Sequence, residues 1–367
     1  MAIFQSSSIY YSGSYNLGKK AYTSSIGFVW FDCGSQINST SSFKYSYCEY
    51  IPGTPGTPGT PGGGVWSTGG ALNTGRSTFG GAGTQNAALA FGGSPTLCCT
   101  EEYNGSTWTN VNPLSIRRRY VGGTGNQNAA LAFGGNSVFN SPSWAVGRCT
   151  EEYNGSTWAS GGATVACLGF RAGAGTQNAG LAIGGGSPAS ATSTEEYNGS
   201  SWATGGLLPS ARQSVAGTGT QNAGFAIGGA NSPNSFGDTY TYNGSSWSSD
   251  ANTNIARYGA TGYGSTTSAL VDRGGRLSGG TNILQFDVET YNGTSWTTGV
   301  SSTTRKMNHA GAGDDTNALS FGGYGGSPSP FSPALTLTEE YNAGPGTPGT
   351  PGTPGYYQLA TGSINLA

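Results

Sequence analysis

The chain has 367 residues, a formal net charge of -2 and only 9% charged residues, so it offers no clustered Lys and Arg for nucleic acid or an anionic membrane surface. No apolar run approaches the length of a membrane-spanning helix. The 66 glycines, accompanied by many Ser, Thr, Asn and Tyr residues, favour strands and turns over helices, and we expect an all-β protein.

The first sixteen residues have neither a basic start nor a continuous apolar stretch, which is not the pattern of a signal peptide. The alternation in IFQSSSIYY suits a strand that docks on a neighbouring subunit or adds to a sheet. We therefore predict an N-terminal extension or docking strand over residues 1–16.

A Tyr–Trp element recurs along the chain. It stands as TEEYNGSTW at 100–108 and 150–158, TEEYNGSSW at 194–202, YTYNGSSW at 240–247 and ETYNGTSW at 289–296. Asn-Gly between alternating segments is a strong hairpin signal, because a type I′ turn needs positive φ at both central residues. Two degenerate copies, CEY ending at Tyr50 with Trp66 beyond it and TEEYN with Tyr341, bring the series to seven.

A second element precedes each Tyr. It occurs as GAGTQNAALAFGG at 81–93, with close copies at 123–135, 173–185 and 217–229, a looser one at 311–323, and weaker relatives at 262–275 and 24–34. Each unit offers a small-residue strand, a polar Gln-Asn turn, a strand ending in Gly-Gly, a variable loop and the Tyr–Trp hairpin. This order predicts a four-stranded antiparallel meander of about 45 residues.

Such sheets must stack to bury both faces, and a closed ring of blades achieves this. We therefore predict a seven-bladed β-propeller over residues 17–361, with a C-terminal tail at 362–367. The first blade is built from about 17–68, and Tyr356 or Tyr357 replaces Trp in the last. Six blades plus an N-terminal extension is the alternative.

The stretch PGTPGTPGTPG occurs at 52–62 and again at 345–355. With seven blades, both copies are insertions into the same hairpin turn of the first and last blades, which excludes a domain linker. The triplet favours polyproline II, and we expect the two tracts to pack side by side for assembly. Their threonines are candidate assembly or O-glycan sites: Thr54, Thr57, Thr60, Thr347, Thr350 and Thr353.

The Gly-Gly doublet, the Tyr of the third strand and the Trp of the fourth resemble the kelch repeat, as does LLPSAR at 207–212. The wording GTQNAALAFGG…TEEYNGSTW is similar above all to kelch-like repeats in virion proteins of tailed phages infecting marine bacteria. The resemblance implies a virion-surface or tail-fibre role. Its partners would then be other virion or fibre subunits, copies of itself and a host-surface glycan.

A basic residue lies ten positions after almost every repeat Trp: Arg76, Arg118, Arg212, Arg257 and Lys306, with Leu168 as the exception. A ring of cations near a central channel could bind an acidic sugar or another carboxylate. However, ten of the seventeen acidic residues belong to the EEY element or its remnants. A structural ion pair repeated by duplication is therefore the interpretation that we favour.

The loops after Gly-Gly vary in length and sequence, as in SPTLCCT at 94–100 and NSVFNSPSWAVGRCT at 136–150. Constant strands that carry variable loops are typical of a binding surface on a rigid scaffold. Aromatic residues there could stack on sugar rings or anchor an interface, or they could fold back over their own blades. The candidates are Phe139, Trp144, Phe236, Tyr324 and Phe331.

The sequence gives little support for metal or cofactor chemistry. It has one His, His309, and six Cys without a CxxC motif, which disfavours a metal cage and excludes the copper site of galactose oxidase relatives. Cys33 and Cys48 flank a predicted strand connection and either pair or stay free. No catalytic triad, P-loop or dinucleotide motif is present, and the SxDxGxTW box of sialidases is absent. We expect no metal, no cofactor and no enzyme.

Together these observations predict a non-catalytic protein of a virion surface or extracellular filament, which binds a host-surface glycan or protein through its variable loops. A purely structural, self-assembling filament or decoration subunit is the competing class. A sialidase-like glycan hydrolase is the third.

Overall fold

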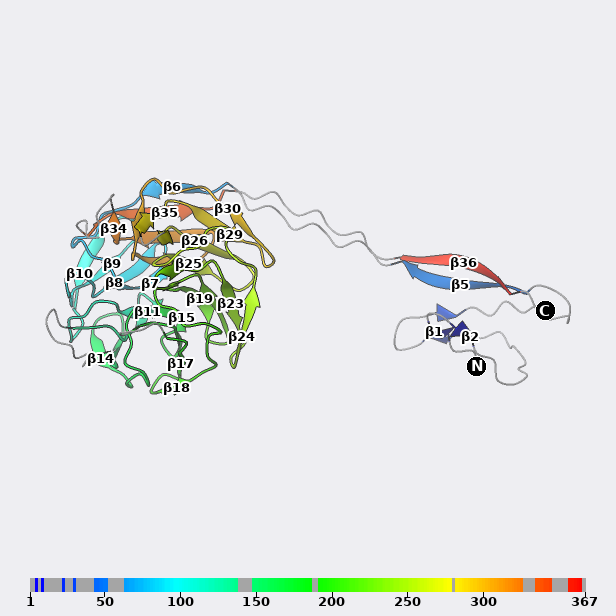
Figure 1. Ribbon diagram of the computed structural model, residues 1–367, viewed down its shortest axis with the longest axis horizontal. Helices are drawn as coiled ribbons and strands as arrows, with labels where there is room; N and C mark the ends of the chain where they lie inside the picture. The colour runs from blue at the N-terminus through cyan, green and yellow to red at the C-terminus, as the bar shows by residue number, and fades with distance from the viewer. Residues whose placement is uncertain are drawn as a thin grey trace. The chain divides into compact units, whose positions relative to one another are not determined.

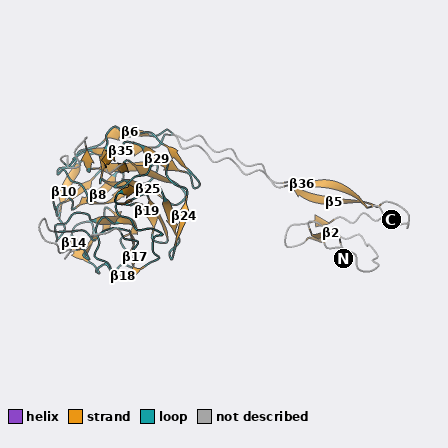
Figure 2. Cartoon of the chain, viewed as in Figure 1, coloured by secondary structure: helices purple, strands orange, loops and turns teal. Residues whose placement is uncertain are grey.

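The computed structural model describes residues 63–137, 147–186, 191–278, 281–325 and 334–344, together with the backbone of strands at 4–5, 8–9, 22–23, 29–30, 43–51 and 356–364. The chain divides into two compact units, residues 61–346 and residues 1–60 with 347–367. All regular elements in the described residues are strands (Figure 2). Accordingly, none of these residues belongs to a helix that could cross a membrane.

Residues 61–346 form a β-propeller of six four-stranded antiparallel blades (Figure 1). Blade 1 contains β7 (Gly80–Thr84), β8 (Ala87–Phe91), β9 (Thr100–Tyr103) and β10 (Trp108–Val111). Blade 2 contains β11 (Gly122–Asn126), β12 (Ala129–Phe133), β13 (Thr150–Tyr153) and β14 (Trp158–Ser160). Blade 3 contains β15 (Ala172–Thr176), β16 (Ala179–Ile183), β17 (Thr194–Tyr197) and β18 (Trp202–Thr204).

Blades 4 to 6 complete the ring. Blade 4 contains β19 (Ala216–Thr220), β20 (Ala223–Ile227), β23 (Thr239–Tyr242) and β24 (Trp247–Asp250). Blade 5 contains β25 (Thr261–Gly264), β26 (Ala269–Asp272), β29 (Val288–Tyr291) and β30 (Trp296–Thr298). Blade 6 contains β32 (Ala310–Gly313), β33 (Asn317–Phe321), β35 (Thr338–Asn342) and β6 (Val65–Thr68).

Glycine allows the six inner strands to converge on the axis. A Cβ atom at Gly173 of β15 would lie 2.1 Å from the carbonyl oxygen of Gly123 on β11. A side chain at this position would therefore force the two blades apart. The small-residue pattern GAG or GTG, which starts the repeat in every blade except blade 5, is thus the part of the sequence that sets the spacing of the ring.

The second strand of each blade supplies the apolar core. Leu89 and Phe91 of blade 1 are fully buried and pack with Ala130 and Ala132 of blade 2. Both faces of a blade are therefore covered by its neighbours, which explains why these strands read as nearly continuous apolar runs.

The predicted count of seven blades is wrong, and the count in the six-blade alternative is confirmed. The two degenerate copies of the repeat are not two blades, because Tyr341 on β35 pairs with Trp66 on β6 in the same sheet. Their ring centroids lie 5.2 Å apart. One blade is thus assembled from both ends of the chain, and residues 17–60 contribute no described strand to the ring.

The second unit contains three described strand pairs. Two are short: β1 (Phe4–Gln5) with β2 (Ser8–Ile9), and β3 (Tyr22–Thr23) with β4 (Val29–Trp30). The third is long and antiparallel, β5 (Phe43–Ile51) with β36 (Tyr356–Ile364), and it places Tyr50 opposite Tyr357. The Tyr of the predicted first blade therefore belongs to this unit and not to the propeller.

The Gly-Thr-Pro tracts connect the two units along the chain. Residues 52–64 run from β5 to β6 and residues 343–355 run from β35 to β36, so the two connections have equal length. The prediction that the tracts are hairpin insertions, which excluded a linker, is therefore wrong. Their expected packing and the six threonines named above lie outside the described residues.

Closure of the ring by β6 can be tested with Trp66→Ala. Trp66 is only 8% exposed, and its indole N–H donates to the Val300 carbonyl oxygen at 3.1 Å. Removing a buried Trp side chain should lower the free energy of unfolding by about 3–5 kcal/mol in urea denaturation. Val65→Ala, at the exposed neighbouring position, is the control and should change it by less than about 0.5 kcal/mol. Equal effects of the two substitutions would contradict closure by this strand.

Candidate functional site

The two ends of the propeller differ in how regular their connections are. At one end, two residues join the first two strands in blades 1 to 4, and four join the third and fourth strands in blades 1 to 5. At the other end, the connection between strands two and three ranges from 8 residues in blade 1 to 16 in blades 2 and 6. We call this second end, with the connectors between blades, the loop face.

The Asn-Gly hairpins are confirmed, but their turn type differs from the prediction. Each connection has four residues, and of residues 104–107 only Gly105 has a positive φ. The Asn104 side-chain oxygen accepts hydrogen bonds from the backbone N–H groups of Ser106 and Thr107 at 3.0 and 2.9 Å. The Asn side chain therefore holds the turn, as in an Asx turn.

The repeated arginines are buried in ion pairs within their own blades. Arg118 Nη2 lies 2.9 Å from Glu151 Oε1, and neither side chain is more than 2% exposed. The guanidinium also donates to the carbonyl oxygens of Gly134 and Cys149 at 3.2 and 2.7 Å. Because these carbonyls lie at the two ends of the loop between strands two and three, the arginine fastens the base of that loop.

Equivalent pairs are Arg76–Glu101, Arg171–Glu195 and Arg257–Glu289, while in blade 4 Tyr240 replaces the Glu and Arg212 pairs with Asp238 of the preceding loop, whose side chain is 43% exposed. The arginine side chains in these pairs are at most 1% exposed. This geometry agrees with the structural interpretation, and it leaves no accessible guanidinium at the predicted positions for a ligand.

Blade 3 keeps the ion pair although it lacks the expected arginine. Leu168 is buried where the other blades have Arg or Lys, and Arg171 Nη1 reaches Glu195 Oε1 at 2.6 Å from three residues further along. Arg171 occupies the position of Val121 and Val215 in blades 2 and 4. The predicted position was ten residues after the Trp, and the prediction therefore missed Arg171, which lies three residues further along.

Neighbouring blades are joined by side chains of the Tyr–Trp element. The Tyr153 hydroxyl donates to Glu102 of the preceding blade at 2.8 Å, and the Trp202 indole N–H donates to Thr150 Oγ1 at 2.9 Å. Gln127, expected only as a turn residue, donates to the carbonyl oxygens of Ala88 and Tyr103 at 3.1 and 2.8 Å. The most regular letters of the repeat therefore connect one blade to the next.

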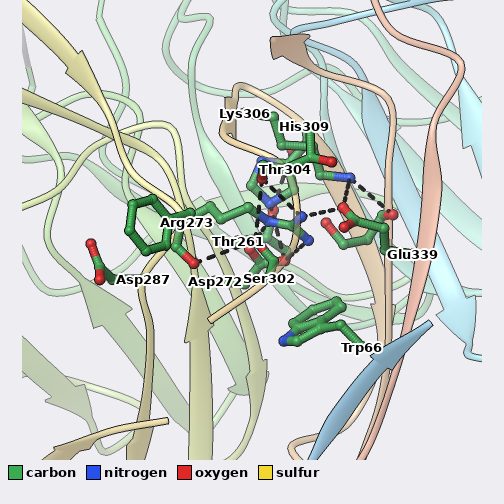
Figure 3. Close-up of polar contacts among 12 residues, drawn as sticks. Trp66, Thr261, Asp272, Arg273, Asp287, Ser302, Thr304, Lys306, His309 and Glu339 are labelled. Carbon is green, nitrogen blue, oxygen red and sulfur yellow. Dashed lines mark hydrogen bonds and ion pairs between the residues drawn. The ribbon is translucent and has the colours of Figure 1, made fainter. Parts of the chain in front are cut away.

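Blade 5 departs from the repeat and builds a buried charged cluster at its contact with blade 6. Asp272 and Arg273 stand where the other blades have an apolar residue and Gly. Figure 3 shows the Arg273 guanidinium between Asp272 and Glu339, with Lys306 and His309 beside them. Lys306 Nζ lies 3.4 Å from Glu339 Oε2.

Burial and mutual charge shift the pKa values within this cluster. Burial lowers the pKa of Lys306 to about 7 and that of His309 to about 4. Burial alone would raise the pKa of Asp272, but Arg273 beside it holds that pKa well below its usual range. These side chains are at most 1% exposed, so the cluster replaces apolar packing and offers no open site for a substrate.

The axial end of the loop face has a closed ring of backbone hydrogen bonds. Six equivalent residues, one per blade, have φ between 52° and 60°: Thr78, Tyr120, Phe170, Ser214, Gly259 and Asn308. Each N–H donates to the carbonyl oxygen of its counterpart in the preceding blade, at 2.7–3.2 Å. We call these six residues the collar.

Three side chains stack at the collar. The Tyr120 and Phe170 rings lie 3.8 Å apart between centroids with an angle of 27° between their planes. The Arg119 guanidinium carbon lies 4.8 Å from the Tyr120 ring centroid, and both residues belong to the connector that leads into β11. All three side chains are half-buried. No periodic signal marks Tyr120 and Phe170 in the sequence, because the equivalent positions in the other blades hold Thr, Ser, Gly and Asn.

The predicted aromatic residues have different outcomes. Phe236 is half-buried, and the Arg212 guanidinium carbon lies 4.8 Å from its ring, so it folds back on its own blade. Tyr324 is half-buried on β34 (Tyr324–Gly325), opposite Met307 on β31 (Lys306–Met307). Phe139, Trp144 and Phe331 lie outside the described residues.

A cavity of about 290 Å³ follows the axis, and its wall is formed mainly by the Gly and Ala residues of the six inner strands. Among the described residues, no group of three or more His, Cys, Asp or Glu side chains could hold a metal ion. Cys98, Cys99 and Cys149 are free thiols. The predicted Cys33–Cys48 pairing lies outside the described side chains.

No protein-family model matches this sequence, and no curated protein is found to be similar to it. The four-stranded antiparallel blades are compatible with kelch-like repeats. The resemblance to phage virion proteins therefore rests on the sequence motifs alone.

The displaced ion pair of blade 3 predicts a rescue. Arg171→Val leaves the Glu195 carboxylate buried without its cation and should lower the free energy of unfolding by about 3–5 kcal/mol. Adding Leu168→Arg restores the arrangement of the other blades and should recover more than half of the loss. Urea denaturation of both variants measures this, and a double variant no more stable than Arg171→Val would contradict the equivalence of the two positions.

The pKa of Lys306 predicts a pH dependence of stability. Its folded-state pKa of about 7 lies below the ordinary 10.5, so between these values the unfolded chain binds a proton that the folded protein does not. Stability should therefore rise with pH across this window, by roughly 3 kcal/mol at most between pH 7 and 9.5. Lys306→Met should flatten the rise in urea midpoint, and an unchanged slope would refute the assignment.

Proposed function

We propose that this protein is a non-catalytic recognition subunit of a virion surface or extracellular fibre, and that its loop face binds a host-surface glycan or protein. The observation that carries the proposal is that the connections with the largest differences in length, those between strands two and three, all lie at one end of the ring. Those connections range from 8 to 16 residues, whereas the hairpins at the other end are nearly constant. Such a division is typical of binding loops on a fixed scaffold.

The scaffold is built so that loops can differ without disturbing the blades. In blade 2 the buried Arg118 holds both ends of the loop through the Gly134 and Cys149 carbonyl oxygens. Residues between these anchors are then free of any role in the ion pair.

Neighbouring loops also support one another on the loop face. The hairpin β21 (Ala230–Asn231) with β22 (Asn234–Ser235) belongs to blade 4, and β27 (Gly275–Ser278) with β28 (Thr281–Leu284) belongs to blade 5. The Leu277 N–H donates to Ser235 Oγ at 3.2 Å, which joins the two hairpins. Ile283 and Phe286 nearby are 39% and 37% exposed, and such side chains are suitable interface anchors.

We propose no catalysis, because the repeated arginines that a sialidase-like site would need at its surface are buried in ion pairs. A purely structural filament or decoration subunit remains the second candidate function, favoured by the same resemblance. It differs in requiring that the loops contact copies of this chain and nothing else.

The proposal is tested with the full chain on host cells and on glycan and surface-protein arrays. The double substitution Ile283→Ala with Phe286→Ala should weaken binding at least about tenfold, the effect of losing an interface anchor. Asn222→Ala, in an exposed hairpin at the opposite end, is the matched control and should leave binding unchanged. Unaltered binding in the double variant, or self-association as the sole interaction, would overturn the proposal.

A further inference from the structure

The basic residues of the propeller fall into two groups. Seven are buried and lie in the ion pairs described above: Arg76, Arg118, Arg171, Arg212, Arg257, Arg273 and Lys306. The other five are exposed or half-buried: Arg117, Arg119, Arg148, Arg276 and Arg305. All five stand in the connectors or loops of the loop face.

Acidic residues are distributed in the opposite sense. Among the described connections of the loop face, the acidic side chains are Asp238 and Asp287, and Asp238 is already paired with buried Arg212 at 3.3 Å. The described short hairpins at the other end contain Asp314 and Asp315 and no basic residue. The loop face is therefore positive although the whole chain carries -2, and it would attract an anionic ligand.

The collar gives this charge a defined position. Tyr120 and Phe170 hold φ of 60° and 57°, a conformation that is unfavourable for bulky residues and that Gly259 adopts freely in blade 5. Backbone strain of this kind concentrates at functional sites. The ring of hydrogen bonds that imposes it also fixes the stack of Arg119, Tyr120 and Phe170.

The chemistry of the collar favours a sugar over a protein. Its other side chains are the polar Thr78, Ser214 and Asn308, and the large hydrophobic residues that are exposed in the described chain lie elsewhere. Burial raises the pKa of Tyr120, the Arg119 guanidinium lowers it, and the Tyr324 phenol adds to the rise. An aromatic stack beside one guanidinium, in a ring whose other side chains carry hydroxyls and an amide, suits a pyranose that carries an acidic group.

We infer that the collar binds an anionic saccharide, a uronate or a sulfated sugar, with the Arg119 guanidinium holding the acidic group and the Tyr120–Phe170 stack contacting the sugar ring. This inference rests on the proposed function of the loop face and names its ligand class. A planar guanidinium forms two parallel hydrogen bonds to a carboxylate or sulfate, which a Lys at the same position would not reproduce.

The test measures binding of the full chain to polygalacturonate, chondroitin sulfate and neutral dextran by calorimetry. We expect binding to at least one of the two anionic polymers and none to dextran. The two polymers distinguish the uronate from the sulfate. Arg119→Ala should weaken the binding at least tenfold and Arg119→Lys nearly as much, while Phe170→Leu should weaken it severalfold without loss of secondary structure.

Arg305→Ala is the matched control, because Arg305 is exposed on the same face with its guanidinium carbon 5.0 Å from the Phe286 ring. It should change the affinity less than threefold. Equal losses in Arg305→Ala and Arg119→Ala would reveal unspecific charge attraction and overturn the inference. So would binding of neutral glycans or of an acidic protein that Arg119→Ala leaves intact, although the proposed function would then stand. Absence of binding to any glycan or host protein would refute both.

Discussion

The structure depends on the contacts that join each blade to the one before it. A blade of four strands has two faces to bury, and the repeat supplies the means in its Tyr, Trp and Gln side chains. Tyr153 and Trp158 of blade 2, for example, donate to Glu102 and Thr100 of blade 1. Equivalent contacts recur at most of the joints, as between Tyr197 and Glu152 or between Trp247 and Thr194, and an open circle would leave a Tyr and a Trp without partners at one end. The residues that recur in the repeat are therefore those at the contacts between blades, and the residues that vary lie in the loops.

Much of the fold could be predicted from the sequence because the repeat is local. The meander, the Gly-Gly at the end of the second strand and the hairpin before Trp all follow from residues within one unit. The number of blades could not, because it depends on a pairing between Trp66 and Tyr341, which are distant in the chain. Each residue looked like half of an incomplete repeat, and counting both halves as blades gave seven. For the same reason the Gly-Thr-Pro tracts were predicted to be insertions in the hairpins of a first and a last blade, whereas Tyr341 pairs with Trp66 in one blade.

Less of the candidate site than of the fold could be predicted from the sequence. The arginines were candidate ligand-binding residues because they are regularly spaced. A residue that recurs in almost every blade is more often part of the scaffold, and Arg118 and its counterparts are indeed buried. The collar could not be predicted from the sequence because a positive φ here does not require one residue type: Tyr120, Ser214 and Gly259 all adopt it. The cluster around Arg273 was not predicted for another reason: Asp272 and Arg273 of blade 5 meet Lys306, His309 and Glu339, which are distant in the chain, only once the blades are packed. The residues of the proposed binding site, Arg119, Tyr120 and Phe170, are departures from the repeat and not part of it.

The central claim is that a fixed ring presents one variable face for recognition. Hydrogen exchange of the full chain, with and without host cells or their purified surface material, tests it most directly. The account predicts that bound ligand protects amides of the loop face, including 117–121 and 273–287, and leaves the turns at 104–107 and 198–201 unchanged. Protection of those turns, or protection that is equal at both ends of the ring, would contradict it.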